Sequence, residues 1–181
     1  MDRGRQDALY AEASAANAAA IRRLARGYEA DPDRQRDMLQ DIHMELWVSL
    51  RSFDGRCSLR TWVYRIAHNV GASHAVRNRR LTSRLVDLET LEARISSVDG
   101  EAEVEHRFSA AILLDLIHRL KPLDRQVIML YLEGEAAGSI AEVTGITAGN
   151  VATKIHRIKR VLKQKYLEGA ADARTGQSAR T

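Results

Sequence analysis

Residues 120–165 are LKPLDRQVIMLYLEGEAAGSIAEVTGITAGNVATKIHRIKRVLKQK, a stretch whose pattern is that of three helices joined by short turns. A first helix is expected over residues 122–132, because proline is tolerated in a first helical turn, where the N–H that it lacks would be unpaired. A short second helix is expected over residues 139–144. Gly145 can then adopt the left-handed conformation that reverses the chain, and the Thr147 hydroxyl can cap a third helix. This order of elements predicts a helix-turn-helix.

The third helix of this stretch has an apolar side and a basic side. Its apolar residues are spaced by four, three and four positions and form one predicted stripe: Val151, Ile155, Ile158 and Leu162. Six basic residues and no acidic residue lie between positions 154 and 165. Such a helix fits the major groove of duplex DNA, with early residues at base edges and later ones on phosphates. The residues predicted to bind DNA here are Thr147, Asn150, Thr153, Lys154, His156, Arg157 and Arg160.

The alternative interpretation of this helix is a solvated basic face on a helix that only packs. We favour DNA binding, because the turn at Gly145, the cap at Thr147 and the short preceding helix are the elements that a helix-turn-helix requires.

The N-terminal half, residues 8–80, also has apolar residues at helical spacing, with breaks near residues 31–32 and 53–55. Three helices joined by short turns are predicted. The second has one buried stripe, made of Met38, Leu39, Ile42, Leu46 and Leu50. Trp62 lies on the apolar stripe of the third helix and is assigned to the core, whereas Tyr64, Arg65 and Asn69 are assigned to its polar side.

A change of composition separates the two halves. Between residues 81 and 107 there are seven acidic residues against three arginines, a net charge of −4, and the helical periodicity is weak. This predicts a flexible acidic linker. The expected organisation is an all-α chain of two small helical domains, at residues 8–80 and 106–168, joined by a linker at 81–105 and followed by a disordered tail at 169–181.

Composition restricts the class of protein. The chain has no long apolar segment that would span a bilayer or serve as a secretory signal, so a cytoplasmic protein without membrane insertion is expected. The single cysteine, Cys57, has no nearby partner for a disulfide or a zinc site. No phosphate-binding glycine loop, metal-ligand cluster or activated nucleophile is present in the sequence, so we expect no enzyme, no cofactor, no metal and no small-molecule substrate.

Four segments resemble the extracytoplasmic-function (ECF) subfamily of sigma-70-type RNA polymerase sigma factors. Residues 31–47, DPDRQRDMLQDIHMELW, resemble region 2.2 of that subfamily, and residues 59–69, LRTWVYRIAHN, resemble its region 2.3 to 2.4 helix. Residues 120–127, LKPLDRQV, and residues 146–151, ITAGNV, resemble parts of region 4. The segments occur in the family's order, so the two predicted domains would be regions 2 and 4.

The resemblance implies a transcription initiation factor that binds core RNA polymerase, recognises the minus-thirty-five and minus-ten promoter elements and promotes DNA melting. In the family, region 2.2 docks on the polymerase, which implies a polymerase-binding role for Asp37, Gln40 and Asp41. The loop before the region 2.3 helix captures a flipped base, a task for which Phe53 and Arg56 have suitable chemistry. Family members usually have an anti-sigma factor as partner, and one is expected here.

The remaining DNA contacts of the N-terminal domain are expected on and beside the same helix. Their polar or basic side chains suit a DNA strand, and the last three would neutralise phosphates: Ser58, Arg60, Tyr64, Arg65, Asn69, Ser73, Arg77, Arg79 and Arg80. Three positions depart from the common family pattern, namely Ser73, Ser139 and Ala152, so the promoter sequence does not follow from the resemblance.

Two other functions remain open from the sequence. A free-standing dimeric repressor or activator would bind an operator without polymerase, but it would leave the acidic face of residues 37–47 without a role. A regulatory interaction protein would use its N-terminal domain mainly to bind a partner, which is compatible with a sigma factor.

Overall fold

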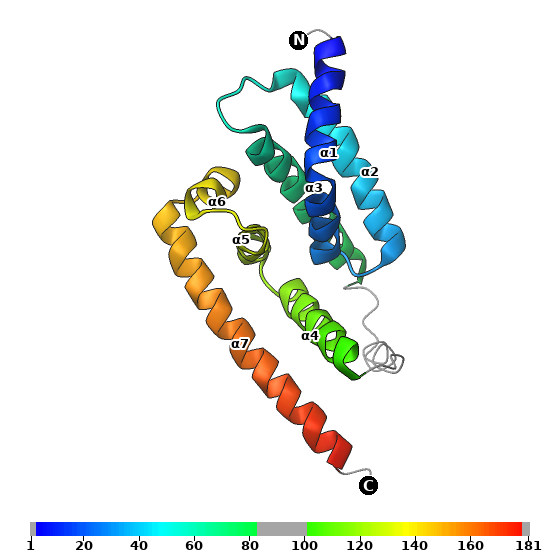
Figure 1. Ribbon diagram of the computed structural model, residues 1–181, viewed down its shortest axis with the longest axis vertical. Helices are drawn as coiled ribbons and strands as arrows, with labels where there is room; N and C mark the ends of the chain where they lie inside the picture. Colours follow the sequence, from blue (N-terminus) through cyan, green and yellow to red (C-terminus); the bar gives the residue numbers. More distant parts are fainter. Residues whose placement is uncertain (1–2, 83–100, 179–181) are drawn as a thin grey trace.

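The computed structural model describes residues 3–82 and 101–178, with side chains described for residues 3–77 and 110–164. Three long helices form the N-terminal domain: α1 (Arg3–Tyr28), α2 (Pro32–Ser49) and α3 (Leu59–Thr82), with a 3-10 turn, η1 (Leu50–Ser52), after α2. The C-terminal domain contains α4 (Glu101–His118), α5 (Pro122–Leu132), α6 (Ala137–Thr144) and α7 (Ala148–Ser178). Figure 1 shows α7 along one side of the molecule, with α5 and α6 between it and the N-terminal bundle. The all-α prediction is confirmed, since the described ranges contain no strand.

Local sequence explains where the helices of the N-terminal domain begin. The Asp31 carboxylate caps α2 by accepting hydrogen bonds from the backbone N–H groups of Asp33 and Arg34, and Pro32 occupies the first helical turn. At the start of α3, the Ser58 hydroxyl accepts a hydrogen bond of 3.0 Å from the Thr61 backbone N–H. The helices are therefore interrupted near residues 31–32 and 53–55, as predicted.

The core of the N-terminal domain is the predicted stripe of α2 packed between α1 and α3. Met38, Ile42, Leu46 and Leu50 are fully buried. Ile21 and Leu24 of α1 and Val63 of α3 meet them. Full burial of a side chain of this size contributes roughly 1.5–3 kcal/mol, so this stripe holds the bundle together.

One polar pair lies inside this bundle. The Tyr28 hydroxyl lies 3.0 Å from Nδ1 of the fully buried His68. Burial lowers the pKa of His68 to about 3, so its imidazole is neutral and Nδ1 accepts the tyrosine hydrogen bond. Gly71 lies against the Tyr28 ring, where a Cβ atom would stand 2.6 Å from Cδ2, so the helix crossing requires a glycine at this position.

The helix-turn-helix forms as the sequence predicted. Gly145 ends α6 with a left-handed φ of 75°, and the Thr147 hydroxyl accepts a hydrogen bond of 3.3 Å from the Asn150 backbone N–H at the start of α7. The α7 stripe packs against α5 and α6: Val151, Ile158 and Leu162 are buried and Ile155 is half-buried. This packing fixes which face of α7 points outward.

The ends of the linker and the C-terminal tail differ from expectation. Helix α3 extends to Thr82 and α4 begins at Glu101, so helix occupies both ends of the predicted 81–105 linker, and residues 83–100 lie outside the described residues. Helix α7 continues to Ser178, in place of the disordered tail expected from residue 169. The glycine, serine and threonine content suggested disorder, whereas alanine and arginine, which are good helix formers, prolong the helix. None of the described helices has the length and apolarity that crossing a membrane requires.

Candidate nucleic-acid and polymerase interfaces

The outward face of α7 carries the DNA-binding residues predicted for the C-terminal domain. Lys154 is half-buried and the other six are exposed, namely Thr147, Asn150, Thr153, His156, Arg157 and Arg160. Thr147 precedes and caps α7, and the other six residues lie on one side of the first half of this helix, so these side chains lie along one edge of the domain. This geometry suits the major groove.

Two of these cations are held by a carboxylate that the sequence reasoning missed. Asp124 in the first turn of α5 is 8% exposed and pairs with Lys154 Nζ at 2.7 Å and with an Arg157 guanidinium nitrogen at 3.1 Å. In the sequence, Asp124 is visible only as an acidic residue three positions after Lys121. Its partners Lys154 and Arg157 are 30 and 33 residues away, so local spacing does not reveal them. Asp124 therefore fixes the position of two predicted DNA contacts relative to the domain core.

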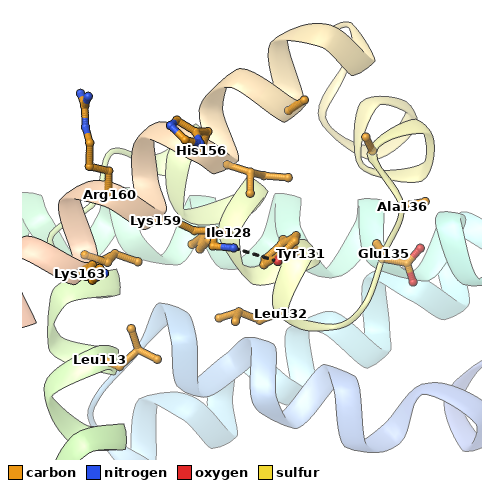
Figure 2. Close-up of a pocket in the computed structure, with 14 residues that line it drawn as sticks. Leu113, Ile128, Tyr131, Leu132, Glu135, Ala136, His156, Lys159, Arg160 and Lys163 are labelled. Atoms are coloured by element: carbon orange, nitrogen blue, oxygen red, sulfur yellow. Dashed lines mark hydrogen bonds between the residues drawn. The ribbon is translucent and has the colours of Figure 1, made fainter.

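An apolar groove of about 980 Å³ lies beside this edge, between α4, α5 and α7 (Figure 2). Leu113, Leu132 and Ile155 are among its apolar lining residues. Its basic rim consists of His156, Lys159, Arg160 and Lys163. The Lys159 ammonium lies 5.2 Å above the Tyr131 ring, within the range of a cation–π contact. Thus His156 and Arg160, predicted for DNA, also border this groove.

In the N-terminal domain, the loop before α3 is ordered by its own side chains. The Phe53 ring packs edge-on against Trp62 at 5.4 Å, and the Trp62 indole N–H donates to the Ser49 hydroxyl at 3.0 Å. Trp62 was assigned to the core, and the structure buries about half of this residue. The Arg56 side chain is exposed and pairs with Asp54 at 2.9 Å. Phe53 is therefore not free to stack on a base unless it leaves Trp62.

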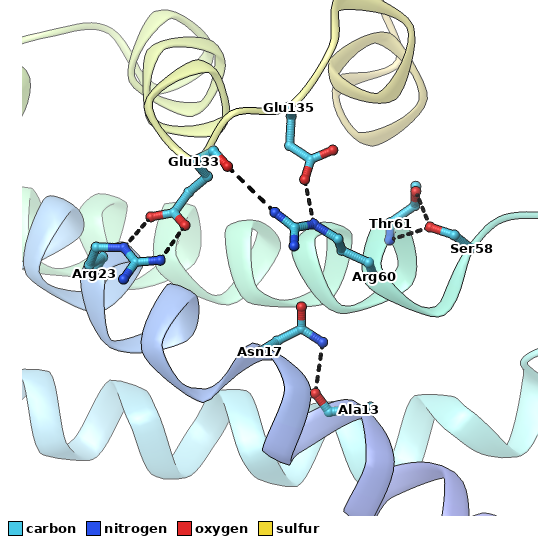
Figure 3. Close-up of polar contacts among 8 residues, drawn as sticks. All are labelled: Ala13, Asn17, Arg23, Ser58, Arg60, Thr61, Glu133 and Glu135. Carbon is cyan, nitrogen blue, oxygen red and sulfur yellow. Dashed lines mark hydrogen bonds and ion pairs between the residues drawn. The ribbon is translucent and has the colours of Figure 1, made fainter.

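The start of α3 is covered by the C-terminal domain. Arg60 Nε lies 2.5 Å from a Glu135 carboxylate oxygen (Figure 3), and an Arg65 guanidinium nitrogen donates to the Glu142 backbone carbonyl at 2.9 Å. Tyr64 is only 1% exposed, and burial raises the pKa of its phenol to about 12. Tyr64, which was expected on the polar side of this helix, is thus covered in this arrangement, because helical spacing within one domain carries no information on what another domain covers.

Further along α3 the predicted DNA contacts are open to solvent. Asn69, Ser73 and Arg77 are exposed, and the Ser73 hydroxyl donates to the Asn69 backbone carbonyl at 2.9 Å. Arg79 and Arg80 belong to α3, but their side chains lie outside the described residues.

The predicted polymerase-binding residues lie on α2. Asp37 and Gln40 are exposed, whereas Asp41 is half-buried and its carboxylate lies 2.7 Å from Nε2 of the buried His74. The same helix exposes Met44 and Val48, at 57% and 46%. Sequence reasoning missed these two, although apolar residues on a polar helix face were a visible signal. Together they form a mixed acidic and apolar surface suited to a protein partner.

Comparison with known families matches both domains. The model for "Sigma-70 region 2" matches residues 15–81, and the model for "Sigma-70, region 4" matches residues 110–162. The first match runs from the middle of α1 to the end of α3, and the second runs from the middle of α4 to the middle of α7. The chain belongs to the ECF subfamily of sigma-70-type sigma factors.

Relatives of this sigma factor are found in several bacteria. It is 28% identical over 137 residues to the ECF RNA polymerase sigma-E factor of Haemophilus influenzae, a match covering 71% of this chain and 72% of the relative. It is 24% identical over 142 residues to the ECF RNA polymerase sigma factor SigX of Bacillus subtilis, covering 76% and 73%. Its function is accordingly that of an RNA polymerase sigma factor in transcription initiation.

Two solved structures share the fold of this sigma factor. One is the sigma factor RpoE in complex with the anti-sigma factor NepR from Bartonella quintana, with a TM-score of 0.64, 21% identity and coverage of 88% of this chain and 96% of the other. The second is CnrH in complex with the cytosolic domain of CnrY, with a TM-score of 0.60, 20% identity and coverage of 95% and 97%.

Proposed function

We propose that this sigma factor binds core RNA polymerase through α2 and holds a promoter at two points. Helix α7 would bind the minus-thirty-five duplex, and α3 with the loop before it would bind the minus-ten element and promote its melting. The observation that carries the proposal is the outward edge of α7, where six predicted contacts are exposed and a seventh, Lys154, is fixed by Asp124.

The α7 contacts divide by their chemistry. Thr147, Asn150 and Thr153 are short polar residues in the first turns, where a recognition helix meets base edges. Arg157 and Arg160 follow, and their cationic side chains suit base edges or phosphates. Region 4 would thus supply both sequence recognition and affinity for the duplex.

At the minus-ten element, the exposed Arg56, Asn69, Ser73 and Arg77 would contact the DNA strand directly. Phe53, Arg60, Tyr64 and Arg65 would join them after rearrangement, since each is engaged by Trp62 or by the C-terminal domain. The factor would perform no covalent chemistry, since its role is to bind, orient and open DNA for the polymerase active site.

Asp37 and Gln40 would contact the polymerase, with Asp41 oriented by His74 and with Met44 and Val48 supplying apolar area. We further propose an anti-sigma factor as a regulatory partner and the cytoplasm as the site of action. One solved structure of the same fold is a complex with the anti-sigma factor NepR, and the other is a complex with the cytosolic domain of CnrY.

The experiment that tests the proposal measures promoter binding with and without polymerase. Fragments of bacterial promoter DNA are incubated with the factor, with core RNA polymerase, and with both. We expect a specific complex only when both proteins are present. Tight binding by the factor alone, with no gain from core polymerase, would instead support a free-standing repressor or activator.

The α7 assignment has its own test. Arg157→Ala is expected to weaken binding of the factor with core polymerase to the minus-thirty-five duplex by about 1–3 kcal/mol if this residue reaches a base. Lys163→Ala, at the groove on the same helix, is the control and should change binding less. Equal binding by Arg157→Ala and wild type at several salt concentrations would remove Arg157 from the interface.

A further inference from the structure

The groove between α4, α5 and α7 has an apolar floor that is open to solvent (Figure 2). Leu132 is 56% exposed, and Leu113 and Ile155 are half-buried. Ile128 and Leu162, which also line the groove, are buried. Apolar side chains gathered at one exposed site are a feature of surfaces that bind a ligand or a partner. The proposed function assigns no role to this floor.

The size of the groove is that of a site for a small molecule. Its lining residues on α7 run from Ala152 to Lys163, a distance of about 16 Å along the helix axis at 1.5 Å per residue. Its volume of about 980 Å³ lies at the upper end of the range of ligand pockets, about 300–1,000 Å³. The groove is therefore large enough for an extended alkyl chain that lies along α7.

One edge of the groove is cationic. Lys159, Arg160 and Lys163 of α7 line it and are exposed. Within the part of the chain that the structure describes, none of these three side chains pairs with a carboxylate. Glu135, the acidic residue among the described lining residues, instead pairs with Arg60 at 2.5 Å. The positive charge of this edge therefore faces solvent and favours an anionic ligand group.

Lys159 and Tyr131 form a pair of hydrogen-bond donors at this edge. Figure 2 shows the Lys159 side chain reaching from α7 to Tyr131 of α5, where its Nζ lies 3.3 Å from the hydroxyl oxygen. The ammonium donates to that oxygen, so the hydroxyl proton can be donated elsewhere, and among the described residues it has no acceptor. A carboxylate placed here would accept charge-assisted hydrogen bonds from both groups.

A single alkyl chain suits this site better than a protein helix does. A helix with its side chains is about 10–12 Å across, so a helix laid on the floor would displace the Lys159 side chain from Tyr131. An alkyl chain can lie on Leu132 and Leu113 and leave the pair in place to bind its carboxylate. Binding without rearrangement is favoured, because no ordering of side chains opposes it.

We propose that this groove binds a free fatty acid, with the alkyl chain on the apolar floor and the carboxylate on Lys159 and Tyr131. His156 and Arg160 line the groove and are also predicted DNA contacts. An anion bound beside them reduces their attraction for phosphates, so the fatty acid lowers the affinity of α7 for the minus-thirty-five duplex. The effect on DNA rests on the proposed function, whereas the binding of the fatty acid does not.

Calorimetric titration of the full chain with dodecanoate, below the concentration at which it forms micelles, tests the binding. Butanoate has the same carboxylate without the long chain, and dodecyltrimethylammonium has the same chain with the opposite charge. We expect dodecanoate to saturate one site and each control to bind at least about tenfold more weakly, since chain and charge both contribute. Binding of dodecanoate no tighter than that of either control would overturn the proposal.

Two variants locate the site. Tyr131→Phe keeps the ring and removes one hydrogen bond to a charged group, so it should weaken dodecanoate binding by about tenfold. Leu132→Gln removes part of the floor at an exposed position and should weaken binding by a similar factor of about ten. Val161→Gln is the matched control, because Val161 is a 37% exposed apolar residue of α7 that does not line the groove. Wild-type affinity in either Tyr131→Phe or Leu132→Gln would contradict the site as placed.

Two further probes distinguish other occupants. Binding of the chain to vesicles of phosphatidylcholine and phosphatidylglycerol, with no binding of dodecanoate, would identify a membrane surface in place of a free fatty acid. Binding of an acidic amphipathic helical peptide, with no binding of dodecanoate, would identify a protein helix as the occupant. Either result would overturn the proposal.

The effect on DNA is measured on the promoter complex of the factor with core polymerase. Dodecanoate should reduce the amount of this complex, and Tyr131→Phe should require about tenfold more dodecanoate for the same loss. An undiminished complex at saturating dodecanoate would overturn the effect on DNA. Failure of the proposed function is distinguishable, because it would appear as absence of the promoter complex without dodecanoate, whatever the calorimetry shows.

Discussion

Two buried ionisable residues set the local properties of this sigma factor. Asp124 ties Lys154 and Arg157 of α7 to α5, and His68 hydrogen-bonds Tyr28 inside the N-terminal bundle. The first organises a surface for DNA, and the second stabilises a helix crossing. Each gives a prediction that a single substitution can check.

Asp124→Asn keeps the shape of the side chain and removes its charge. Without that charge, Lys154 and Arg157 lose the group that positions them and gain net positive charge toward DNA. We expect the ratio of promoter duplex binding to unrelated duplex binding to fall, with a steeper salt dependence. Stability should fall by about 1–3 kcal/mol, because hydrogen bonds to a charged group are lost. Gel shifts of both duplexes with the factor and core polymerase measure the ratio, and an unchanged ratio would contradict a positioning role.

His68 gives a prediction about acid stability. Its pKa is lowered to about 3 by burial, whereas in the unfolded chain it is close to the ordinary 6.5, so the unfolded state binds the proton more readily. The stabilising contribution is present above pH 6.5 and is lost as the pH falls from 6.5 toward 3. Between pH 7 and pH 5 the wild type should lose about 2 kcal/mol more unfolding free energy than His68→Gln, which does not titrate. Urea unfolding at the two pH values measures this, and equal losses would refute it.

At the scale of elements, the turn between α6 and α7 depends on one left-handed residue. Gly145 has a φ of 75° and open space around its Cα, so a Cβ atom there would meet no neighbour. The cost of Gly145→Ala should therefore be conformational alone, about 1–2 kcal/mol.

Gly149→Ala is the matched control within α7. Its Cβ would also meet nothing, but its backbone is helical, so the substitution should stabilise the domain by about 0.5–1 kcal/mol. Thermal unfolding of both variants measures the contrast. A destabilised Gly149→Ala or a neutral Gly145→Ala would show that the turn is held by something other than backbone conformation.

The elements also show what the sequence could predict. Pro122, Gly145 and Thr147 mark helix ends by local chemistry, so the structure of the helix-turn-helix followed from them. The α2 stripe followed from helical spacing. The C-terminal extension of α7 to Ser178 did not, because composition alone does not separate a weak helix from a disordered tail.

The candidate site was less accessible to sequence reasoning, for a different physical reason. Side chains on one helix face could be grouped, but Asp124 with Lys154, and Arg60 with Glu135, meet across 30 and 75 residues of chain. Only tertiary packing brings them together. The burial of Tyr64 is the clearest instance, since it depends on the position of a second domain.

At the scale of the whole molecule, the two domains meet through a contact that salt should weaken. The Arg23–Glu133 and Arg60–Glu135 ion pairs join the domains at a partly exposed surface. Raising NaCl from about 0.05 to about 0.5 M shortens the screening length severalfold and should increase the distance between fluorophores on cysteines introduced at Glu45 of α2 and Ala148 of α7, in a Cys57→Ser background. Glu133→Gln/Glu135→Gln, which lacks both pairs, should respond little. A distance that salt leaves unchanged in wild type would mean that the packing of Met129 against Gly27, and not charge, holds the domains.

A sigma factor directs core RNA polymerase to promoters, and this activity can be measured on the whole molecule. The measurement is in vitro transcription of genomic fragments by core polymerase with and without the factor, with the 5′ ends of the transcripts mapped. We expect new, specific start sites that depend on the factor and whose use Arg157→Ala reduces. Transcripts identical in the presence and absence of the factor would contradict it.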